Sequence, residues 1–584
     1  MQTQSGRTTA RTPRIFIVEA SAGSGKTYAL SKRYVGLLLD PRRHPDDIPL
    51  RSILAITFTN KAAFEMKGRI LELLRRLALD IFEHPAEREE LIAFLGDDAP
   101  RIRRKARAAM DHLVRNYNFF QVQTIDSFIN ALLAGCAFKL DLSSKFLIKN
   151  DYLDYLRYAI DRLIDRVRVD TGLAGLFREF LHQYLVLEQR TSWFPKQDIM
   201  RIIDRLVCSY NTYGRSFSRY PGTASDIFKE RRRLRGLLGE LAEQLPETTD
   251  RRFRESLRRT LAENRSSVSV DELSVFFDRP DFPVRGGARP GPALKRSWAS
   301  IRRQCRMLVE LEALAVFDCY IGLFDRFLVE FSRAARRDNV VFLAELNRTA
   351  RLLFDEGFVT VPELYLRLAC RFDAYLIDEF QDTSSLQWKN IVPLVEDGLA
   401  RGGSLFYVGD KKQAIYRFRG GEVDLFDSVR EEFARFKPVH DVLRTNYRSR
   451  REIVAFNNTL FSPENVRRAL LQLKTRNSGS ALALSDGDID DIARFYEETS
   501  QDWRPDKQGG FVGVESIAGR DEDERSDAVR ARLVAAVTDI SGRFPYRDIA
   551  VLARSNDHVE LCAGWLMHAG IPVQSDKTVN IRQH

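Results

Sequence analysis

Close to its N-terminus the chain carries the sequence Ala20-Ser21-Ala22-Gly23-Ser24-Gly25-Lys26-Thr27. An apolar run from Arg14 to Val18 precedes it and predicts a short buried strand, and the pattern from Tyr28 to Leu39 predicts an amphipathic helix. A strand, a glycine-rich loop and a helix in this order form the context of a phosphate-binding loop. The usual first residue of that loop is glycine, so Ala20 makes this motif a variant.

The residue types in this loop suit a nucleoside triphosphate. Backbone N–H groups around the two glycines can surround phosphate oxygens at the N-terminus of the predicted helix. The ammonium group of Lys26 would lie at the β- and γ-phosphates, and the hydroxyl of Thr27 is placed for Mg²⁺. We therefore predict that the nucleotide is bound by Ser21, Ala22, Gly23, Ser24, Gly25, Lys26 and Thr27.

The composition is that of an ordinary globular protein with several domains. The chain has 584 residues, of which 44% are hydrophobic and 29% charged, and a length of this order implies three or four domains. Its formal net charge of +10 permits a polyanionic partner. The six cysteines form no Cys-x-x-Cys pair, which argues against a zinc or iron–sulfur site and favours a reducing compartment. Because no run of 18 uncharged apolar residues occurs, we expect no membrane span and a cytoplasmic protein.

Strand and helix patterns alternate in two stretches of the sequence, 14–150 and 336–424. Strands are predicted at 52–58 and 119–125, with a helix from about Lys61 to Leu77, and strand patterns return at 374–377 and 404–408. Such alternation is typical of an α/β fold with a parallel sheet. The first domain is therefore predicted to comprise residues 14–150 and 336–424.

Between these two parts the apolar period becomes helical. Apolar residues from Leu153 to Val167 share one helix face, and a long helix is expected from Met307 to Ala335. We interpret 151–335 as one helical, arginine-rich insertion, whose basic runs either contact a polyanion or form a solvated surface. Residues 425–584 are predicted to form a second α/β domain, with strands at 510–514 and 548–552 and a helix at 525–539.

An acidic sequence, Asp378-Glu379-Phe380-Gln381-Asp382, directly follows the predicted strand at 374–377. Parallel sheets bind ligands at the carboxyl ends of their strands. Asp378 can hold Mg²⁺ there, and Glu379 can orient and deprotonate the attacking water. An isolated Asp-Glu pair is most often a solvated turn, but a phosphate-binding loop in the same chain favours the catalytic interpretation.

A second polar sequence follows the strand at 404–408. Gln413 could contact the γ-phosphate, because an amide bonds both water and phosphate oxygen. Next, Tyr416 and Phe418 alternate with Arg417 and Arg419, which suits bases stacked beside phosphates. The alternative for this second stretch is a strand with a buried and a solvated face.

These motifs, together with Thr57-Phe58-Thr59-Asn60-Lys61-Ala62-Ala63 and Leu443-Arg444-Thr445-Asn446-Tyr447-Arg448-Ser449, occur in the order found in superfamily 1 helicases. The chain resembles the UvrD/Rep type of that superfamily. The sequence Glu19 to Thr27, the lack of room upstream for an adenine-reading glutamine motif and the long spacing between Thr27 and Asp378 resemble its RecB/AddA branch. This resemblance implies a P-loop, RecA-like motor domain with a large helical insertion and a partial second RecA-like domain.

The resemblance also implies roles at matching positions. Lys26 and Thr27 would bind phosphate and Mg²⁺, and Asp378 and Glu379 the Mg²⁺ and the water. Gln413 and Arg448 would contact the γ-phosphate, and Tyr447 would stack on adenine or, alternatively, be a buried strand-end tyrosine. A single-strand DNA track would be lined by Thr57, Phe58, Thr59, Asn60, Tyr416, Phe418, Arg419 and Arg554. Asp126 stands where the family usually has histidine, so we expect no phosphate contact there.

The implied activity is that of an ATP- and Mg²⁺-dependent DNA helicase moving 3′ to 5′, acting in double-strand-end processing and recombinational repair. Its expected partners are single-stranded and duplex DNA and a nuclease or helicase subunit. Two further motifs of these motors do not follow residue 573, so we expect a chain truncated before the last helicase motifs. The alternative is a scaffold that binds ATP and DNA without hydrolysis. A P-loop kinase or GTPase would need a different base and no aromatic track.

Overall fold

The computed structural model describes residues 14–44, 47–140, 142–143, 145–182, 184–185, 195–219, 224–262, 271–277, 281–285, 290–355, 357, 359–414, 421–476, 484–497 and 499–575. The contacts within the chain divide it into two compact units. The first comprises Met1–Arg448 and Phe461–Asp502, and the second comprises Ser449–Leu460 and Trp503–His584.

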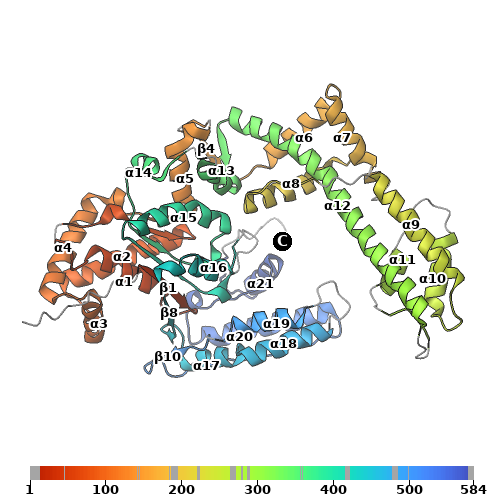
Figure 1. The fold of residues 1–584 in the computed structure, drawn as a ribbon. Helices are drawn as coiled ribbons and strands as arrows, with labels where there is room; N and C mark the ends of the chain where they lie inside the picture. Colours follow the sequence, from red (N-terminus) through yellow and green to blue (C-terminus); the bar gives the residue numbers. More distant parts are fainter. Residues whose placement is uncertain are drawn as a thin grey trace, which may run out of the picture. The chain divides into compact units, whose positions relative to one another are not determined.

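The first unit is built on a six-stranded parallel sheet with the order β3-β2-β6-β7-β1-β8. Two of its strands, β1 and β8, are labelled in Figure 1. A parallel strand in the middle of such a sheet is covered on both faces, so it reads as a continuous apolar run. This is why the sequence marks the central strands closely, and the predicted α/β fold is confirmed. The strands are β1 (Ile15–Ala20), β2 (Ile53–Thr57), β3 (Val122–Thr124), β6 (Ala374–Ile377), β7 (Ser404–Gly409) and β8 (Val439–Leu443).

Helices cover both faces of this sheet. Successive side chains of β1 serve different faces, since Ile17 joins one hydrophobic core and Val18 the other. The core around Val18 is closed by α1 (Lys26–Leu38), α2 (Asn60–Leu79), α3 (Pro85–Leu95) and α4 (Ala99–Arg115). The core around Ile17 is closed by α5 (Ile125–Cys136), α13 (Leu346–Asp355), α14 (Val361–Leu368), α15 (Ser385–Ala400) and α16 (Leu425–Glu432).

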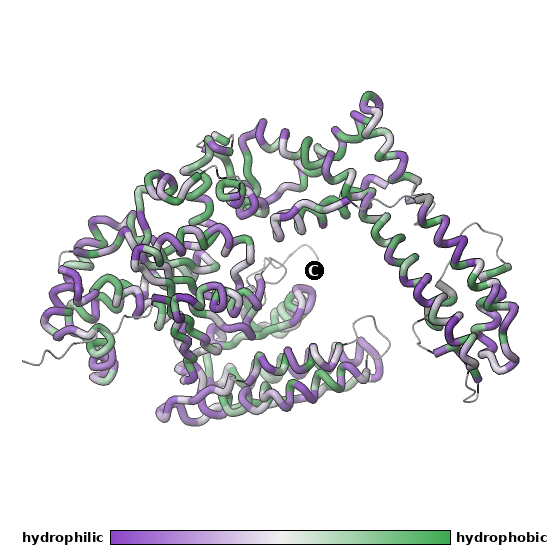
Figure 2. Tube along the Cα trace, viewed as in Figure 1, coloured by the Kyte–Doolittle hydropathy of each residue, from purple (hydrophilic) through white to green (hydrophobic). Residues whose placement is uncertain are grey.

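The predicted helical insertion lies between two short strands that pair in parallel, β4 (Leu147–Lys149) and β5 (Val340–Phe342). Its longest element, α12, runs over 46 residues, well beyond the predicted Met307–Ala335, and hydrophobic and hydrophilic residues alternate along it (Figures 1 and 2). The helices are α6 (Leu153–Arg166), α7 (Thr171–His182), α8 (Lys196–Tyr213), α9 (Ala224–Glu243), α10 (Arg251–Ala262), α11 (Asp271–Phe277) and α12 (Pro292–Arg337).

Two separate hydrophobic cores hold the insertion together. One lies around Phe324 and Phe327 and joins α6, α7 and α8 to the second half of α12. The other lies around Phe253 and Trp298 and joins α9, α10 and α11 to its first half. We call this second core the distal core; none of its residues belongs to either core of the sheet.

The end of the chain differs from its prediction in its strands. No strand forms at 510–514 or 548–552, and Phe511 and Leu552 are almost fully exposed. A strand exists only through pairing, and no described residue pairs with either segment. Beyond residue 424, where the first domain was predicted to end, β8 pairs with β1 in the sheet of the first unit.

The remaining elements are mainly helical. The helix predicted at 525–539 is present as α20, and a two-stranded pair joins β9 to β10. No described helix is both long enough and apolar enough to cross a lipid bilayer. The elements are β9 (Thr445–Asn446), α17 (Arg451–Leu460), α18 (Pro463–Arg476), α19 (Asp486–Arg494), β10 (Asp502–Trp503), α20 (Glu522–Ser541) and α21 (Asn556–His568).

The distal core gives a stability prediction. Trp298 is 1% exposed and contacts the rings of Phe253, Phe277 and Phe282. Replacing it in Trp298→Ala leaves a cavity, and we expect a loss of about 3–5 kcal/mol from the unfolding free energy of this core. This loss is measured by denaturant unfolding, with proteolytic cleavage in α9 and α10 as the signal that the distal core has unfolded. The control Val309→Ala lies on the same helix at an exposed position and should change little; equal sensitivity of the two variants would contradict the assignment.

Candidate nucleotide-binding site

The loop between β1 and α1 is tightly folded. Gly23 and Gly25 have φ angles of 79° and 90°, in the left-handed region that only glycine adopts without strain. The Ser24 hydroxyl donates a hydrogen bond to the carbonyl oxygen of Ser21 at 2.7 Å. The chain therefore turns within a few residues and presents its backbone N–H groups at the N-terminus of α1, where an anion is favoured.

The cationic group of this loop lies between two predicted site residues. Lys26 Nζ is 3.4 Å from Glu379 Oε2 and 3.3 Å from Gln413 Oε1. Glu379 follows β6 and Gln413 follows β7, and in the sheet β7 separates β6 from β1. The structure thus brings together three side chains that are more than 30 residues apart in sequence.

These contacts belong to a closed ring of hydrogen bonds. Gln381 Nε2 donates to Glu379 Oε2 at 2.8 Å, and Gln381 Oε1 accepts the backbone N–H of Asp410 at 2.9 Å. Asp410 Oδ2 accepts from Gln413 Nε2 at 2.7 Å, and Gln413 Oε1 accepts from Lys26. We call Lys26, Glu379, Gln381, Asp410 and Gln413 the phosphate ring.

Two members of the phosphate ring, Gln381 and Asp410, were not assigned a role from the sequence. Both lie inside motifs that the sequence analysis recognised, but the sequence does not show which side chains of those motifs contact one another. Gly409 shows how tightly the two are placed, because a Cβ there would lie 2.4 Å from Gln381 Oε1. A glycine is therefore required at this position by close approach.

The acidic pair has an unusual environment. Asp378 is 4% exposed, and its burial, followed by the charge of Glu379, raises its pKa to about 7, although Lys26 opposes the shift. Glu379 has a φ of 49°, a left-handed conformation that costs a non-glycine residue about 1 kcal/mol or more. A buried carboxylate with this surplus of negative charge is well suited to a cation.

The residues present fit Mg²⁺ bound together with a nucleotide. Mg²⁺ usually takes one or two protein oxygens and completes its shell with phosphate and water. Thr27 and Asp378 would supply those two oxygens. In the described part of the chain there is no group of three or more His, Cys, Asp or Glu side chains that could hold a metal ion by itself.

Residues 446–448 contact the phosphate-binding loop through hydrogen bonds of their backbone and of the Asn446 amide. The N–H of Tyr447 donates to the carbonyl of Gly23 at 2.9 Å, and Asn446 Nδ2 donates to the carbonyl of Ala22 at 3.1 Å. Asn446 Oδ1 accepts the N–H of Arg448 at 2.9 Å. Tyr447 and Arg448, predicted to contact adenine and γ-phosphate, are thus held directly at the phosphate-binding loop, and the half-exposed ring of Tyr447 is not a buried strand-end tyrosine.

Gln501 completes this docking and was missed by sequence reasoning. Its Nε2 donates to the carbonyl of Ala22 at 3.0 Å, and its Oε1 accepts from Asn446 Nδ2 at 3.0 Å. It lies in no recognised motif and is more than 50 residues from Asn446, so no local pattern could have indicated it.

The predicted DNA-track residues at the end of β2 differ in their access to solvent. Thr57 is 1% exposed, so its side chain does not reach the surface, contrary to its predicted place in the track. Thr59 accepts the N–H of Ala62 at 3.1 Å and caps α2, and both Thr59 and Asn60 are exposed. Phe58 is partly buried.

The other predicted DNA contacts are not tested by the structure. Tyr416, Phe418 and Arg419 lie outside the described residues. Arg554 is exposed in the second unit and stays a prediction. Asp126 Oδ1 accepts from Gln387 Nε2 at 3.3 Å, and the absence of a phosphate contact there stays a prediction.

One exposed aromatic residue was missed next to this track. Phe64 is 77% exposed and lies one helical turn after Asn60, so the two residues share a face of α2. Met66, Ile70 and Leu73 form the buried face of the same helix. Its position outside the buried face of the helix was the signal that could have identified Phe64 as a candidate DNA contact.

The loop gives a prediction about nucleotide binding. In Gly23→Ala the new Cβ would lie 2.8 Å from Asn446 Oδ1, on a backbone with positive φ. We expect the affinity for a fluorescent ATP analogue to fall by about tenfold or more. The control is Gly68→Ala in α2, where nothing lies within 4 Å of the added Cβ, and alanine should preserve binding and slightly raise stability. Unchanged affinity in Gly23→Ala would contradict this docking.

Comparisons with known proteins agree with the geometry. The family model of the UvrD/REP helicase N-terminal domain matches residues 1–434. Three similar curated proteins are each named as one subunit of an ATP-dependent helicase/nuclease. They come from Geobacillus thermodenitrificans (26% identical, over 96% of this chain and 48% of the relative), Geobacillus kaustophilus (27%, with the same coverage) and Bacillus mycoides (23%, again over 96% and 48%).

The chain spans about half the length of these curated relatives. The family model covers well over half of the chain, including the phosphate-binding loop and every member of the phosphate ring. The geometry of the loop and ring and the family match lead to the same conclusion. This chain belongs to the UvrD/REP helicase family.

Proposed function

We propose that the chain is the ATP-binding and DNA-tracking part of a DNA helicase that moves 3′ to 5′ on single strands and acts at double-strand ends in recombinational repair. The observation that carries this proposal is the phosphate ring, since it joins the phosphate-binding loop to the acidic motif and to the glutamine after β7. The names of the relatives, which are helicase/nuclease subunits, support the substrate and the process.

ATP binding would open the phosphate ring at Lys26. Its ammonium group now has Glu379 and Gln413 as acceptors, and the γ-phosphate would be a stronger one because charge-assisted bonds to phosphate exceed those to a neutral amide. Gln413 would then be free to turn its amide to the same phosphate. Arg448 would stabilise the charge that develops on the transferred group.

Glu379 is placed to act on the attacking water. Gln381 holds one of its oxygens at 2.8 Å, which fixes the direction of the carboxylate. Once phosphate takes Lys26, the ion pair between Lys26 and Glu379 is broken, and the carboxylate is released to accept a hydrogen bond from the water. Bound Mg²⁺, held by Thr27 and Asp378, would neutralise charge on the β- and γ-phosphate oxygens.

The state of the nucleotide would reach the DNA through the chain itself. Gln413 is followed directly by the segment that carries Tyr416, Phe418 and Arg419, the proposed base-stacking and phosphate-binding residues. Arg448 is the last residue before the chain enters the second unit at Ser449. A rearrangement at the γ-phosphate would therefore be transmitted along the backbone to the segment that carries Tyr416, Phe418 and Arg419 and to the second unit.

A cytoplasmic location and a partner protein complete the proposal. The relatives are named as one subunit of an enzyme, which supports assembly with a further subunit. All six cysteines are free, as is common in a reducing compartment where DNA and ATP are also present.

The first test is hydrolysis. In Glu379→Gln the water loses its proton acceptor, and we expect DNA-stimulated ATP hydrolysis to fall by about a hundredfold or more while ATP binding persists. The rate is measured on the longest available form of the protein, with the exposed Glu396→Gln as control. If wild-type protein binds ATP and DNA but does not hydrolyse ATP, the chain is a scaffold and the helicase proposal is wrong.

The second test concerns the DNA track. Stacking of one base on an aromatic side chain contributes about 1–3 kcal/mol. Phe64→Ala should therefore weaken the binding of an oligothymidine by about fivefold or more, measured by fluorescence anisotropy. Phe138→Ala removes a similarly exposed ring outside the track and should leave the affinity unchanged. Equal affinities for wild type and Phe64→Ala would remove Phe64 from the track.

A further inference from the structure

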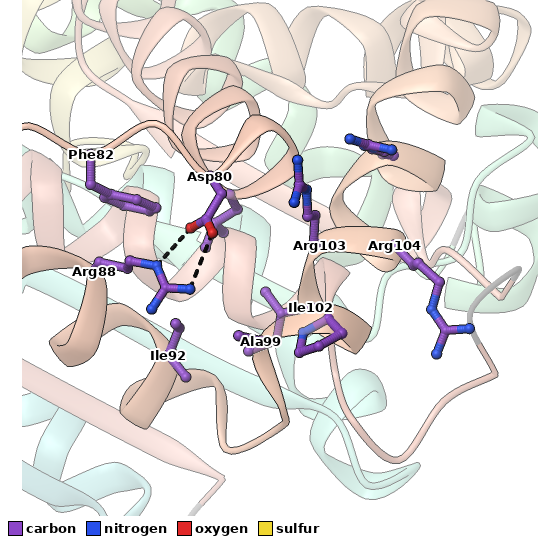
Figure 3. A pocket seen from close by; sticks show the side chains of 11 residues that line it. Asp80, Phe82, Arg88, Ile92, Ala99, Ile102, Arg103 and Arg104 are labelled. Atoms are coloured by element: carbon purple, nitrogen blue, oxygen red, sulfur yellow. Dashed lines mark hydrogen bonds and ion pairs between the residues drawn. The ribbon is translucent and has the colours of Figure 1, made fainter. Parts of the chain in front are cut away.

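A pocket of about 610 Å³ lies away from the phosphate ring, among the end of α2, α3 and the beginning of α4 (Figure 3). Its apolar lining comes from Leu77, Phe82, Ile92 and Ile102. The exposed Ile81 precedes Phe82 in sequence and adds apolar surface next to the pocket. The family motifs do not include this region, so the pocket is not explained by the proposed activity.

Four arginines line the same pocket, and only one acidic side chain accompanies them. Asp80 is already paired with Arg88 by two hydrogen bonds, of 2.6 and 3.2 Å (Figure 3). Asp80 also attracts Arg103. The three exposed arginines of α4, Arg103, Arg104 and Arg107, therefore carry more positive charge than this one carboxylate compensates.

Two of these arginines are held in place by the protein. Arg103 Nε and Arg107 Nε both donate to the carbonyl of Ala78, in the last turn of α2, at 3.3 and 3.0 Å. Their terminal nitrogens remain available for an anion. The side chain of Arg104 has no hydrogen bond or ion pair to any described residue. Arg103 and Arg107 are thus tethered, which lowers the entropy that these two side chains lose on binding, whereas Arg104 is not tethered.

Of the three acidic side chains of the neighbouring α3, Glu89 interacts with Arg88, and the other two are paired away from the pocket. Glu87 pairs with Arg76 at 3.1 Å, and Glu90 pairs with Lys32 at 2.5 Å. Both carboxylates are thus engaged on α1 and α2. The excess positive charge of the pocket therefore lies on the arginines of α4.

The position of the pocket separates it from the DNA track. The track residues Thr59 and Asn60 lie at the N-terminus of α2, and Leu77 lies near its C-terminus. A helix of 20 residues is about 30 Å long. The pocket is therefore at the opposite end of α2 from the strand ends that carry the phosphate ring.

We propose that this pocket binds an acidic peptide segment of a partner protein, with one apolar side chain of that segment inserted between Phe82, Ile92 and Ile102. The three arginines of α4 would contact the carboxylates that flank it. A nucleic-acid backbone would match the charge but would leave the apolar lining uncovered, which makes a peptide the better complement.

The test uses a fluorescent peptide that is a short run of aspartates ending in phenylalanine, with anisotropy measured on the whole chain. We expect binding that weakens by about tenfold in Arg104→Glu, since a charge pair becomes a repulsion. Arg115→Glu is the matched control, because this arginine is exposed on the same helix but does not line the pocket. A peptide in which aspartate replaces the phenylalanine should bind several-fold more weakly.

Three outcomes would overturn the proposal. The first is peptide affinity that is equal in Arg104→Glu and wild type, and the second is equal affinity for peptides with and without phenylalanine. The third is a single-stranded or duplex oligonucleotide that loses affinity in Arg104→Glu while the peptide does not, which would assign the surface to DNA. ATP hydrolysis should be unchanged in Arg104→Glu, so this result is independent of the helicase proposal.

Discussion

The position of one ammonium group organises this structure. Lys26 Nζ lies between a carboxylate and an amide that come from two different loops, and it contacts both. The sheet order makes this possible, because β6, β7 and β1 are neighbours and their carboxyl ends meet at one edge. In a parallel sheet this edge is where ligands bind. The order of the strands therefore brings distant parts of the sequence to one phosphate position.

The loops at this edge are fixed by close contacts rather than by bulk packing. Gly23 and Gly409 allow backbone to approach the amide groups of Asn446 and Gln381, and a Cβ at either glycine would meet an oxygen at less than 3 Å. Glu379 keeps a left-handed conformation that its surroundings must impose. Such placement is what a site for phosphoryl transfer needs, since catalysis there depends on position and charge.

The sequence predicted those parts of the fold and site that depend on local pattern. The central strands were found within two residues because burial on both faces makes them continuous apolar runs, and the site residues were found because they follow such runs. The segments at 510–514 and 548–552 have strand-like sequences, but their structure depends on neighbours that the pattern does not contain. The edge strand β8 was not predicted, because its side chains are largely exposed and its sequence is therefore not a continuous apolar run.

The residues that sequence reasoning missed act over long distances. Gln501 contacts the loop at Ala22 through a fold that no spacing reveals, and the arginines of α4 form a pocket only because α2 and α3 surround them. Thr57 was placed in the track with its motif, although β2 is covered on both faces and all of its residues, Thr57 included, are buried. Motifs thus identified which segments carry the chemistry, whereas burial decided which side chains of each segment can take part.

A structure of the protein with Mg²⁺ and a non-hydrolysable ATP analogue would test the role of Lys26 directly. We expect Lys26 Nζ to leave Glu379 and Gln413 for a γ-phosphate oxygen, with Thr27 and Asp378 as the protein ligands of the metal ion. A bound analogue whose phosphates lie elsewhere, with Lys26 still paired to Glu379, would contradict this role.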